Sequence, residues 1–590
     1  MYCFLVLAVL IGSESYRFQA EIHVRAMGER FGAVTLETHE FRVADAGTWT
    51  SVDFAQADNE RVTVREVNRN GRSVISGAVS HFSPDLQDAF ISDVVVHRVS
   101  LDSVKADDVV RIVLERTVDD LCYLPAFSVP NMATLKSYEI AVFHDADLEV
   151  AFEVSSLDPD IKFETNHTDD KSTRFSLTDF DHKVQFPFFA HNDSVTTVIP
   201  QLKRGDDVLT CDTPTVFGAW YKSLLRDLHS LAPEDQAFAR ALIGEATDPR
   251  DQMTQLYQFV RDQVRYDTDM SQQHAIVPHA PSTVLAKRFG DCKDKAYLLC
   301  ALAANAGFDV RFALVSTSPQ MPSSSIRPQF FNHVVNVWFG DDGPVFMDAT
   351  SKHAPLGELA DALFGQEALV MDVMGHTSPQ RLVIEPPGAP GFSISVRGTL
   401  TPEVTHGAMA RLEGDFKYGV INEKHGVVDF ENIISNLITS FLYKISVDYF
   451  RQVDSEQYQC VADLEHFVVV TKRKSYLPSA PFVIPLDGVW ERADDPFPVF
   501  LPSRLQLNLT LDLEHKGFKA NPQEFALSAG SDIDFRASLD SVDQDHSKVS
   551  YKLLINKKFW AVDEKPVLIE FARNYFQHKN KMLTLERGDL

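Results

Sequence analysis

The sequence predicts a multidomain α+β protein with an N-terminal antiparallel β-sandwich, a central α+β core and a mostly-β C-terminal domain. The chain has 590 residues, more than one hydrophobic core usually accommodates. Apolar and polar residues alternate over many short stretches near both ends of the chain, whereas apolar residues follow helical spacing in the middle. From these changes of pattern we expect domains at residues 16–217, 218–385 and 392–590.

The start of the chain, MYCFLVLAVLIGSES, predicts a signal peptide over residues 1–15. An apolar run from Cys3 to Ile11 is followed by the small residues Ser13 and Ser15, which suit a cleavage site. No Lys or Arg precedes the run, so a buried first strand or a wrongly assigned start is the alternative. With a signal peptide we expect a periplasmic or otherwise exported protein, and without one a cytoplasmic protein. The run is too short to cross a bilayer, and we expect no integral membrane span.

Alternation with a period of two indicates the strands of the N-terminal domain. Between Tyr16 and Val24 every second residue is apolar, and the pattern recurs at 110–114 and 148–154. Several such strands with polar turns between them favour an antiparallel sandwich.

Helices introduce the central domain. Thr247-Asp248-Pro249 combines a capping side chain with proline in the first helical turn, and apolar residues follow at helical spacing from Met253 to Val264. This pattern predicts a helical region directly before the most informative motif of the chain.

A linker separates the central domain from the C-terminal domain. Residues 385–391 are rich in Pro and Gly, which interrupt regular structure. Beyond them, alternation at 392–396 and 505–513 predicts strands, and an apolar stripe at 430–441 predicts one amphipathic helix.

The composition excludes some partners and cofactors. The net charge of −27 would repel nucleic acid and anionic lipid surfaces, so we predict no nucleic-acid partner. The six cysteines and histidines such as His274 and His279 lack the spacing of a metal site, so we predict no metal and no cofactor. We interpret Cys122 and Cys211 as small buried residues, although an oxidising compartment would permit them to pair.

The stretch FGDCKDKAYLLCALAANAGF predicts a helix with a cysteine in its first turn. Asp291 is suited to cap this helix, and Asp294 to complete a capping box. The helix N-terminus, together with Lys293 and Lys295, favours the thiolate form of Cys292. A cysteine in this position is a candidate nucleophile.

The same helix supplies an internal comparison. Cys300 lies two turns further along among leucines, where a thiol is expected to be inert. Gly307 is expected to end the helix.

A histidine and an aspartate downstream are placed to assist a thiol nucleophile. In NHVVNVWFGDDGPVFMDAT, His333 opens a predicted strand, GDDG is turn chemistry, and the residues around Asp348 form the return strand. A loop with an even number of residues places Asp348 on the same sheet face as His333, and an odd loop places it on the other face. A catalytic thiol needs an imidazole to share its proton and a third group to orient that imidazole.

Each of these residues also has an ordinary structural explanation. A cysteine at a helix start is more often structural than catalytic, and a histidine on a strand is often a polar residue with a satisfied hydrogen bond. The three residue types in this chain order nevertheless favour a Cys-His-Asp triad.

The segments FGDCKDKAYLLCALAANAGFDVRFALV, FNHVVNVW and FMDAT resemble the catalytic segments of the transglutaminase-like superfamily. The likeness is to bacterial proteins in which this papain-like core lies between an N-terminal β-domain of unknown function and a C-terminal β-rich domain. The resemblance implies that Cys292 is the nucleophile, that His333 is the general base and acid, and that Asp348 orients His333. The family usually has Pro after the aspartate, where this chain has Ala349.

The resemblance also implies two hydrogen-bond donors for an oxyanion. The backbone N–H of Cys292 is one natural donor. Tyr266 is the candidate for the second, with a ring packed in the core at a helix end as its alternative role.

These observations predict a thiol-dependent enzyme that acts on an amide bond of a peptide or protein through an acyl-enzyme. We favour hydrolysis by a cysteine peptidase or amidase over transfer to an amine. The alternative is a non-catalytic binding or scaffold protein of the cell envelope that uses its β-domains. The Ser- and Pro-rich loop at 316–330 is either one wall of a substrate cleft or a connector.

Overall fold

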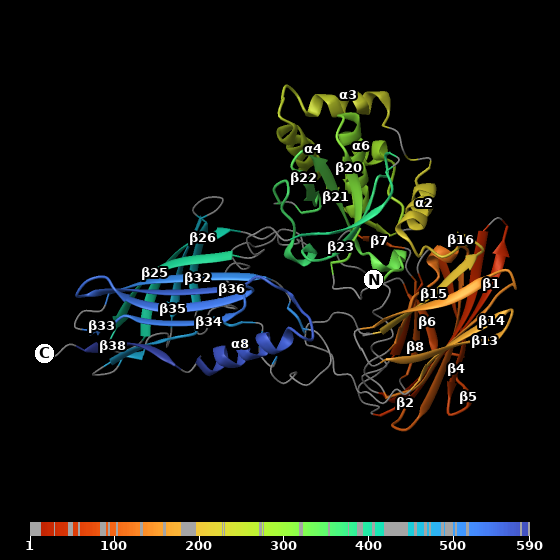
Figure 1. The fold of residues 1–590 in the computed structure, drawn as a ribbon, viewed down its shortest axis with the longest axis horizontal. Coiled ribbons are helices and arrows are strands. Elements are labelled where there is room, and N and C mark those ends of the chain that lie inside the picture. Colours follow the sequence, from red (N-terminus) through yellow and green to blue (C-terminus); the bar gives the residue numbers. More distant parts are fainter. Residues whose placement is uncertain are drawn as a thin grey trace. The chain divides into compact units, whose positions relative to one another are not determined.

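The chain divides into two compact units in the computed structural model. One unit contains Met1–Leu359 and Gly365–Ile384, and the other contains Ala360–Phe364 and Glu385–Leu590 (Figure 1). The structure describes residues 13–587 except for 29, 45–50, 57–58, 83–89, 93–94, 102–103, 130–133, 157–160, 179–195, 227, 229–230, 271–273, 275, 318–322, 352–353, 376, 386–392, 404–406, 418–445, 453–456, 465–468, 471–473, 485, 487–488, 490–498, 502–503, 515–517 and 579–580.

Some sequence predictions lie outside the described residues. These are the apolar run of the predicted signal peptide, most of the predicted linker, and the amphipathic helix predicted at 430–441.

Stacked β-sheets form the N-terminal part of the first unit. Its largest sheet contains, in spatial order, β13 (Lys162–Asp169), β14 (Ser172–Thr178), β11 (Thr134–Phe143), β1 (Ser13–Met27), β2 (Arg30–Val43), β9 (Val109–Val118), β4 (Glu60–Arg69) and β5 (Arg72–Ser73). Two smaller sheets contain β10 (Phe127–Val129), β15 (Thr196–Arg204), β12 (Glu149–Ser156) and β16 (Asp207–Val208), and β3 (Ser51–Gln56), β8 (Val95–Ser100) and β6 (Val79–Phe82). Apolar side chains from all three sheets share one core, as a sandwich requires.

One strand pair of this region departs from the antiparallel prediction. β1 pairs with β2 in the antiparallel sense but with β11 in the parallel sense. Alternation of apolar and polar residues reports which side chains are buried and carries no information on strand direction. The sequence pattern therefore predicted the strands but not this pairing.

A five-stranded sheet covered by helices forms the rest of the first unit. In spatial order its strands are β22 (Gly343–Met347), β21 (His333–Gly340), β20 (Val310–Val315), β23 (Glu367–Met371) and β24 (Gln380–Val383). The helices are α2 (Pro214–Leu224), α3 (Pro233–Leu242), α4 (Pro249–Gln263), α5 (Pro281–Lys287) and α6 (Cys292–Asn305) (Figure 1). α4 begins as predicted, with the Asp248 side chain capping the N–H groups of Arg250 and Asp251.

Helix α6 is the centre of this α+β core. It contacts β20 and β21 on the sheet and α3, α4 and α5 on the helical side. Every residue from Lys293 to Ala303 is buried as a consequence. Over this stretch the helix is enclosed on all sides.

Two short strand pairs bring distant segments to the start of α6. β17 (Arg265–Tyr266) pairs with β19 (Phe289–Gly290), so Tyr266 lies opposite Gly290. β18 (Thr268–Met270) pairs with β7 (Phe90–Ser92) of the N-terminal part. Backbone pairing thus joins the two parts of the first unit near the candidate nucleophile.

The second unit is mostly β. Its large sheet contains, in spatial order, β27 (Ser446–Gln452), β28 (Gln457–Leu464), β26 (Gly407–Lys417), β25 (Ser393–Glu403), β32 (Leu505–Glu514), β36 (His546–Ile555), β35 (Ile533–Ser541) and β34 (Gln523–Ala529). The smaller sheets contain β29 (Val469–Val470), β30 (Lys474–Pro478), β38 (Met582–Arg587) and β33 (Phe518–Ala520), and β31 (Val499–Phe500) with β37 (Phe559–Trp560). Helix α8 (Lys565–His578) packs against β34 (Figure 1). Among the described residues, no helix has the length and apolar character needed to cross a membrane.

Candidate active site

The start of α6 presents Cys292 through a capping box. The Asp291 carboxylate accepts hydrogen bonds from the N–H groups of Lys293 (3.1 Å) and Asp294 (3.4 Å), and the Asp294 carboxylate accepts one from the Asp291 N–H (3.2 Å). Gly290 is required before this cap, because a Cβ at that position would lie 2.6 Å from the Asp294 Cβ. The predicted capping box is confirmed, and Cys292 is the first residue of the helix.

The two lysines beside Cys292 have roles that the sequence did not reveal. Lys293 is buried and its ammonium pairs with Asp291. Lys295 is also buried, and its ammonium donates to the carbonyl groups of Arg261 (3.2 Å) and Val264 (2.7 Å) at the end of α4. Lys295 therefore joins two helices. Burial alone would lower the pKa of Lys293, but the neighbouring Asp291 and Cys292 raise it.

His333 and Asp348 meet on one side of the sheet. Gly340 pairs with Gly343, so Asp341 and Asp342 form a two-residue turn, one of the even loops that the register argument required. His333 Nε2 lies 2.8 Å from Asp348 Oδ2. The other carboxylate oxygen of Asp348 accepts from the Thr350 N–H (2.9 Å) and hydroxyl (2.6 Å).

Burial and opposite charge determine how this pair is protonated. Burial alone would lower the pKa of His333, but the charge and hydrogen bond of Asp348, together with those of Cys292, raise it to about 10. Burial alone would raise the pKa of Asp348, but the imidazolium and the Thr350 hydrogen bonds lower it. An imidazolium at neutral pH is thus favoured, with Cys292 as its second partner.

Tyr266, the candidate oxyanion donor, pairs with Gly290, two residues before Cys292. Tyr266 is 43% exposed, yet desolvation and the Cys292 sulfur both raise the pKa of its hydroxyl. The Asp291 side chain accepts hydrogen bonds from the N–H groups of Lys293 and Asp294, which follow Cys292 in the first turn.

Several residues that support the site were not identified from the sequence. The buried Tyr257 donates to the backbone oxygen of Asp348 (3.0 Å), and His279 donates its backbone N–H to the capping carboxylate of Asp294 (2.8 Å). Tyr221 of α2 is buried, and its pKa is raised by this burial and by Cys292. Only Thr350 carries a local signal, because Asp followed two residues later by Thr is typical of a side-chain turn.

Cys300 has the inert surroundings that the sequence predicted. It is fully buried, its sulfur accepts from Asn336 Nδ2 (3.3 Å), and burial raises its pKa. Cys292 is partly exposed and Cys300 is buried, so the two thiols differ in access.

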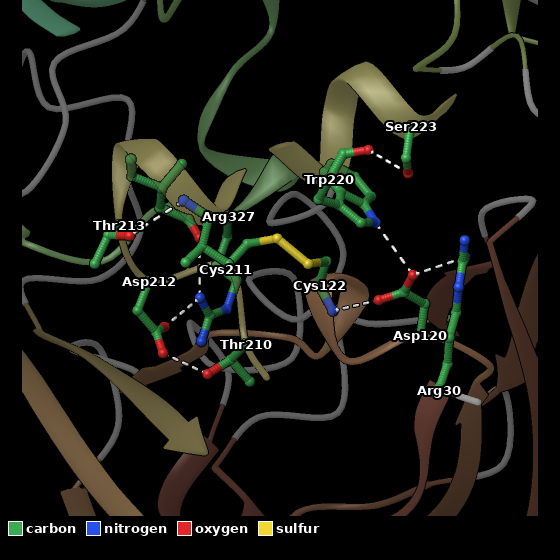
Figure 2. Close-up of a disulfide and its surroundings, with 12 residues drawn as sticks. Arg30, Asp120, Cys122, Thr210, Cys211, Asp212, Thr213, Trp220, Ser223 and Arg327 are labelled. Atoms are coloured by element: carbon green, nitrogen blue, oxygen red, sulfur yellow. Dashed lines mark hydrogen bonds and ion pairs between the residues drawn. A yellow bond between two sulfur atoms is a disulfide. The ribbon is translucent and has the colours of Figure 1, made fainter. Parts of the chain in front are cut away.

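The interpretation of Cys122 and Cys211 as unpaired buried residues was wrong. The two form a disulfide with a Cα–Cα distance of 4.9 Å (Figure 2). They lie 89 positions apart in the chain, and no local pattern reports a pairing over that distance.

Charged and polar contacts fasten the loop before His333 to the N-terminal part. The fully buried Arg327 pairs with Asp212 (2.6 Å) and donates to the Pro200 carbonyl (2.8 Å) (Figure 2). The Glu153 carboxylate accepts from the hydroxyl groups of Ser323, Ser324 and Ser325. The described part of this loop is thus a bridge within the first unit and is not a loose connector.

Comparison with known proteins identifies the central domain. Residues 236–349 match the model of the transglutaminase-like superfamily. The first unit contains a transglutaminase-like domain. The matched range includes Cys292, His333 and Asp348, and α2 lies before it.

One solved structure shares the fold of this chain over nearly its whole length. The "putative protease from Parabacteroides distasonis ATCC 8503" aligns with a TM-score of 0.62 at 11% identity over 97% of this chain and 99% of that one. This likeness shows a common multidomain fold. A "putative cysteine protease from Cytophaga hutchinsonii" aligns with a TM-score of only 0.18 at 12% identity over 42% of this chain and 84% of that one. No curated protein matches the sequence.

The described residues around the transglutaminase-like domain offer no set of three or more His, Cys, Asp or Glu side chains arranged to hold a metal ion. His274 and His279 instead stack at 3.9 Å between ring centroids.

Proposed function

We propose that this protein is a cysteine peptidase or amidase that cleaves an amide bond through an acyl-enzyme. The observation that carries the proposal is the contact of His333, whose side chain is 10% exposed, with Asp348 at 2.8 Å and with Cys292 at the start of a helix. Few structural roles require an imidazolium enclosed between a carboxylate and a thiol.

In the first step, the Cys292 sulfur attacks the amide carbonyl carbon and the carbonyl π electrons move to oxygen. The Cys292 N–H and the Tyr266 hydroxyl are the proposed donors to this oxyanion. His333 then gives its proton to the leaving nitrogen as the C–N bond breaks, and a thioester remains.

In the second step, water attacks the thioester and His333 accepts a proton from that water. The C–S bond breaks, the carboxylic acid leaves, and the sulfur departs as a thiolate beside the newly protonated His333, which restores the starting pair. Asp348 holds His333 in position throughout. An amine in place of water would give transfer, and we propose hydrolysis as the main reaction.

The disulfide supports a proposed location. Disulfides persist in oxidising compartments such as the periplasm and the extracellular space. We therefore propose that the protein works outside the cytoplasm, with Cys122 and Cys211 paired.

Alkylation tests the activated thiol without knowledge of the substrate. The native protein is treated with iodoacetamide between pH 4 and 9, and each cysteine is followed by mass spectrometry, with Cys300 as the internal standard. We expect rapid labelling of Cys292 at pH 7 and a loss of roughly 10- to 30-fold in His333→Ala, because an ordinary thiol is only about 3% ionised at that pH. Equal, slow labelling of both cysteines would contradict the proposal.

A peptide library in ¹⁸O-labelled water tests the reaction itself. Hydrolysis incorporates ¹⁸O into new carboxyl groups, and addition of a primary amine such as cadaverine reveals transfer by a different mass change. Both signals should vanish in Cys292→Ala. A scaffold protein would instead show neither signal and would keep its partners in that variant.

A further inference from the structure

Aromatic side chains from separate segments of the first unit lie close together. Tyr123 lies between β9 and β10 of the N-terminal sheets, Phe217 and Trp220 lie on α2, and Phe331 lies two residues before β21. The ring centroids of Tyr123 and Trp220 lie 5.2 Å apart, those of Trp220 and Phe217 5.3 Å, and those of Phe217 and Phe331 6.0 Å. We call Tyr123, Trp220 and Phe331 the aromatic cluster, with Phe217 as its buried base.

Two links connect the aromatic cluster to the proposed catalytic residues. Phe331 is two residues before His333. Tyr221, next to Trp220, interacts electrostatically with both Cys292 and Tyr123. Cys292, Trp220 and Phe331 also pack, each partly buried, on the same apolar core.

The members of the cluster are not ordinary core residues. Tyr123, Trp220 and Phe331 each retain exposed surface, whereas Phe217 and Tyr221 are only 1% exposed. Cys292 is partly exposed in the same way. A nucleophile and three neighbouring rings therefore keep surface that a ligand can cover.

The disulfide and Asp120 link the segment next to Tyr123 to the helix that carries Trp220 (Figure 2). Cys122 is adjacent to Tyr123, and Cys211 lies three residues before Pro214, where the helix that carries Trp220 begins. Asp120 accepts from the Trp220 indole Nε1 (3.1 Å) and from the Cys122 N–H (2.9 Å). A tryptophan whose polar end is bound in this way offers a rigid apolar surface.

We propose that the aromatic cluster binds a bulky apolar or aromatic side chain of the amide substrate, adjacent to the carbonyl attacked by Cys292. The N-terminal part thereby supplies Tyr123 to substrate recognition. The inference rests on the proposed function for the reacting group, and extends it to the class of side chain selected. A ring of the substrate can pack edge to face against the rings of the cluster. A difference of one methylene group in an apolar pocket already discriminates substrates by roughly 10- to 200-fold.

Two alkylating probes with the same reactive group test the inference. Chloroacetamide and N-benzyl-2-chloroacetamide are compared at Cys292, each rate being divided by its rate with a free thiol. We expect the benzyl probe to react about 10-fold faster or more after this correction. Tyr123→Ala should lower the ratio of the two corrected rates towards one. Phe163→Ala removes an exposed ring on β13 in the same unit and should leave the ratio unchanged.

The outcomes separate this inference from the proposed function. A His333-dependent Cys292 with a corrected ratio of one, or with a ratio indifferent to Tyr123→Ala, overturns the aromatic cluster alone. An inert Cys292 overturns the proposed function.

A binding measurement does not need the thiol and covers that second case. Calorimetry with Cys292→Ala protein should show binding of N-acetylphenylalaninamide in preference to N-acetylglycinamide, and the preference should fall in Cys292→Ala/Tyr123→Ala. Equal affinity for the two amides would overturn the inference.

Discussion

His333 and Asp348 control one another's protonation because little solvent reaches either side chain, which are 10% and 5% exposed. The imidazole gains from the carboxylate and from the Cys292 sulfur more than burial takes from it, which is why its pKa is raised. The same neighbours would have little effect on an exposed histidine, since solvent screens charge. The reactivity of this site therefore depends on enclosure as much as on residue type.

We expect His333 to remain protonated well above neutral pH. Its folded pKa of about 10 exceeds the ordinary value of 6.5, so the imidazolium stabilises the fold fully below pH 6.5 and this contribution disappears as pH rises through 10. NMR of the protein with ¹³C-labelled histidine should show the ring titrating near pH 10.

Asp348→Asn is the matched variant for this titration. It removes the main favourable charge and keeps the burial, so the transition should move towards neutral pH. A transition between pH 6 and 7 in the parent protein would show that the ion pair does not form.

The start of α6 is a short motif in which each residue has a separate task. Gly290 permits the close approach of the Asp294 side chain, and Asp291 and Asp294 cap the helix. Cys292 lies at the positive end of the helix dipole. The loop before β21 has a comparable division of labour, with serines that bind Glu153 and Arg327 that binds Asp212. The first motif thus presents the proposed nucleophile, and the loop joins the strand that carries His333 to the N-terminal part of the first unit.

Gly290→Ala should disrupt the cap. The new Cβ would collide with the Asp294 side chain. The Asp294 carboxylate must then move away from the backbone N–H groups of Asp291 and His279, which donate to it. We expect a loss of about 0.5–2 kcal/mol in the free energy of unfolding and slower alkylation of Cys292. Thermal unfolding and the iodoacetamide assay measure the two effects. Unchanged alkylation would show that the cap does not position the sulfur.

Arg327→Met should destabilise the first unit by about 3–5 kcal/mol, because it leaves the Asp212 carboxylate enclosed without its cation. Arg61→Met is the matched control. Arg61 and Asp119 are 64% and 57% exposed, and the loss of such a pair costs about 0.2–1 kcal/mol. Midpoints of urea unfolding compare the two variants. Similar midpoints would mean that the loop is not held by its buried arginine.

Links of different kinds join the N-terminal sheets to the transglutaminase-like domain within the first unit. The disulfide, the strand pair of β7 with β18, and the Arg327 ion pair all cross between these parts. Residues 214–385 expressed alone would lack Asp212 and Pro200, which bind the buried Arg327. We therefore expect this fragment to be less stable than the same residues in the full chain.

The disulfide should contribute about 2–5 kcal/mol to stability, since it closes a loop between residues 89 positions apart. Protein secreted to the periplasm and denatured without reductant should show Cys292 and Cys300 alkylated but Cys122 and Cys211 protected. Thermal unfolding of Cys122→Ala/Cys211→Ala gives the energetic effect. Alkylation of Cys122 and Cys211 before reduction would contradict the bond.

Local patterns predicted much of the fold and of the candidate site. The capping box spans four residues, and the turn at Asp341-Asp342 sets the register that brings Asp348 to His333. Alternation located β9, β12 and β32. Such signals are readable because the interacting groups are close in the chain or repeat with a known period.

The sequence by itself determined the residues of the proposed chemistry, namely a thiol at a helix start with an imidazole and a carboxylate on neighbouring strands. Only the tertiary structure decided which distant groups surround that chemistry: the Cys122–Cys211 bond, the burial of Arg327 against Asp212, and the approach of Tyr123 to the site. These contacts join residues that lie about 90 or more positions apart. Their partners are selected by how whole elements pack, and no short stretch of sequence records that choice.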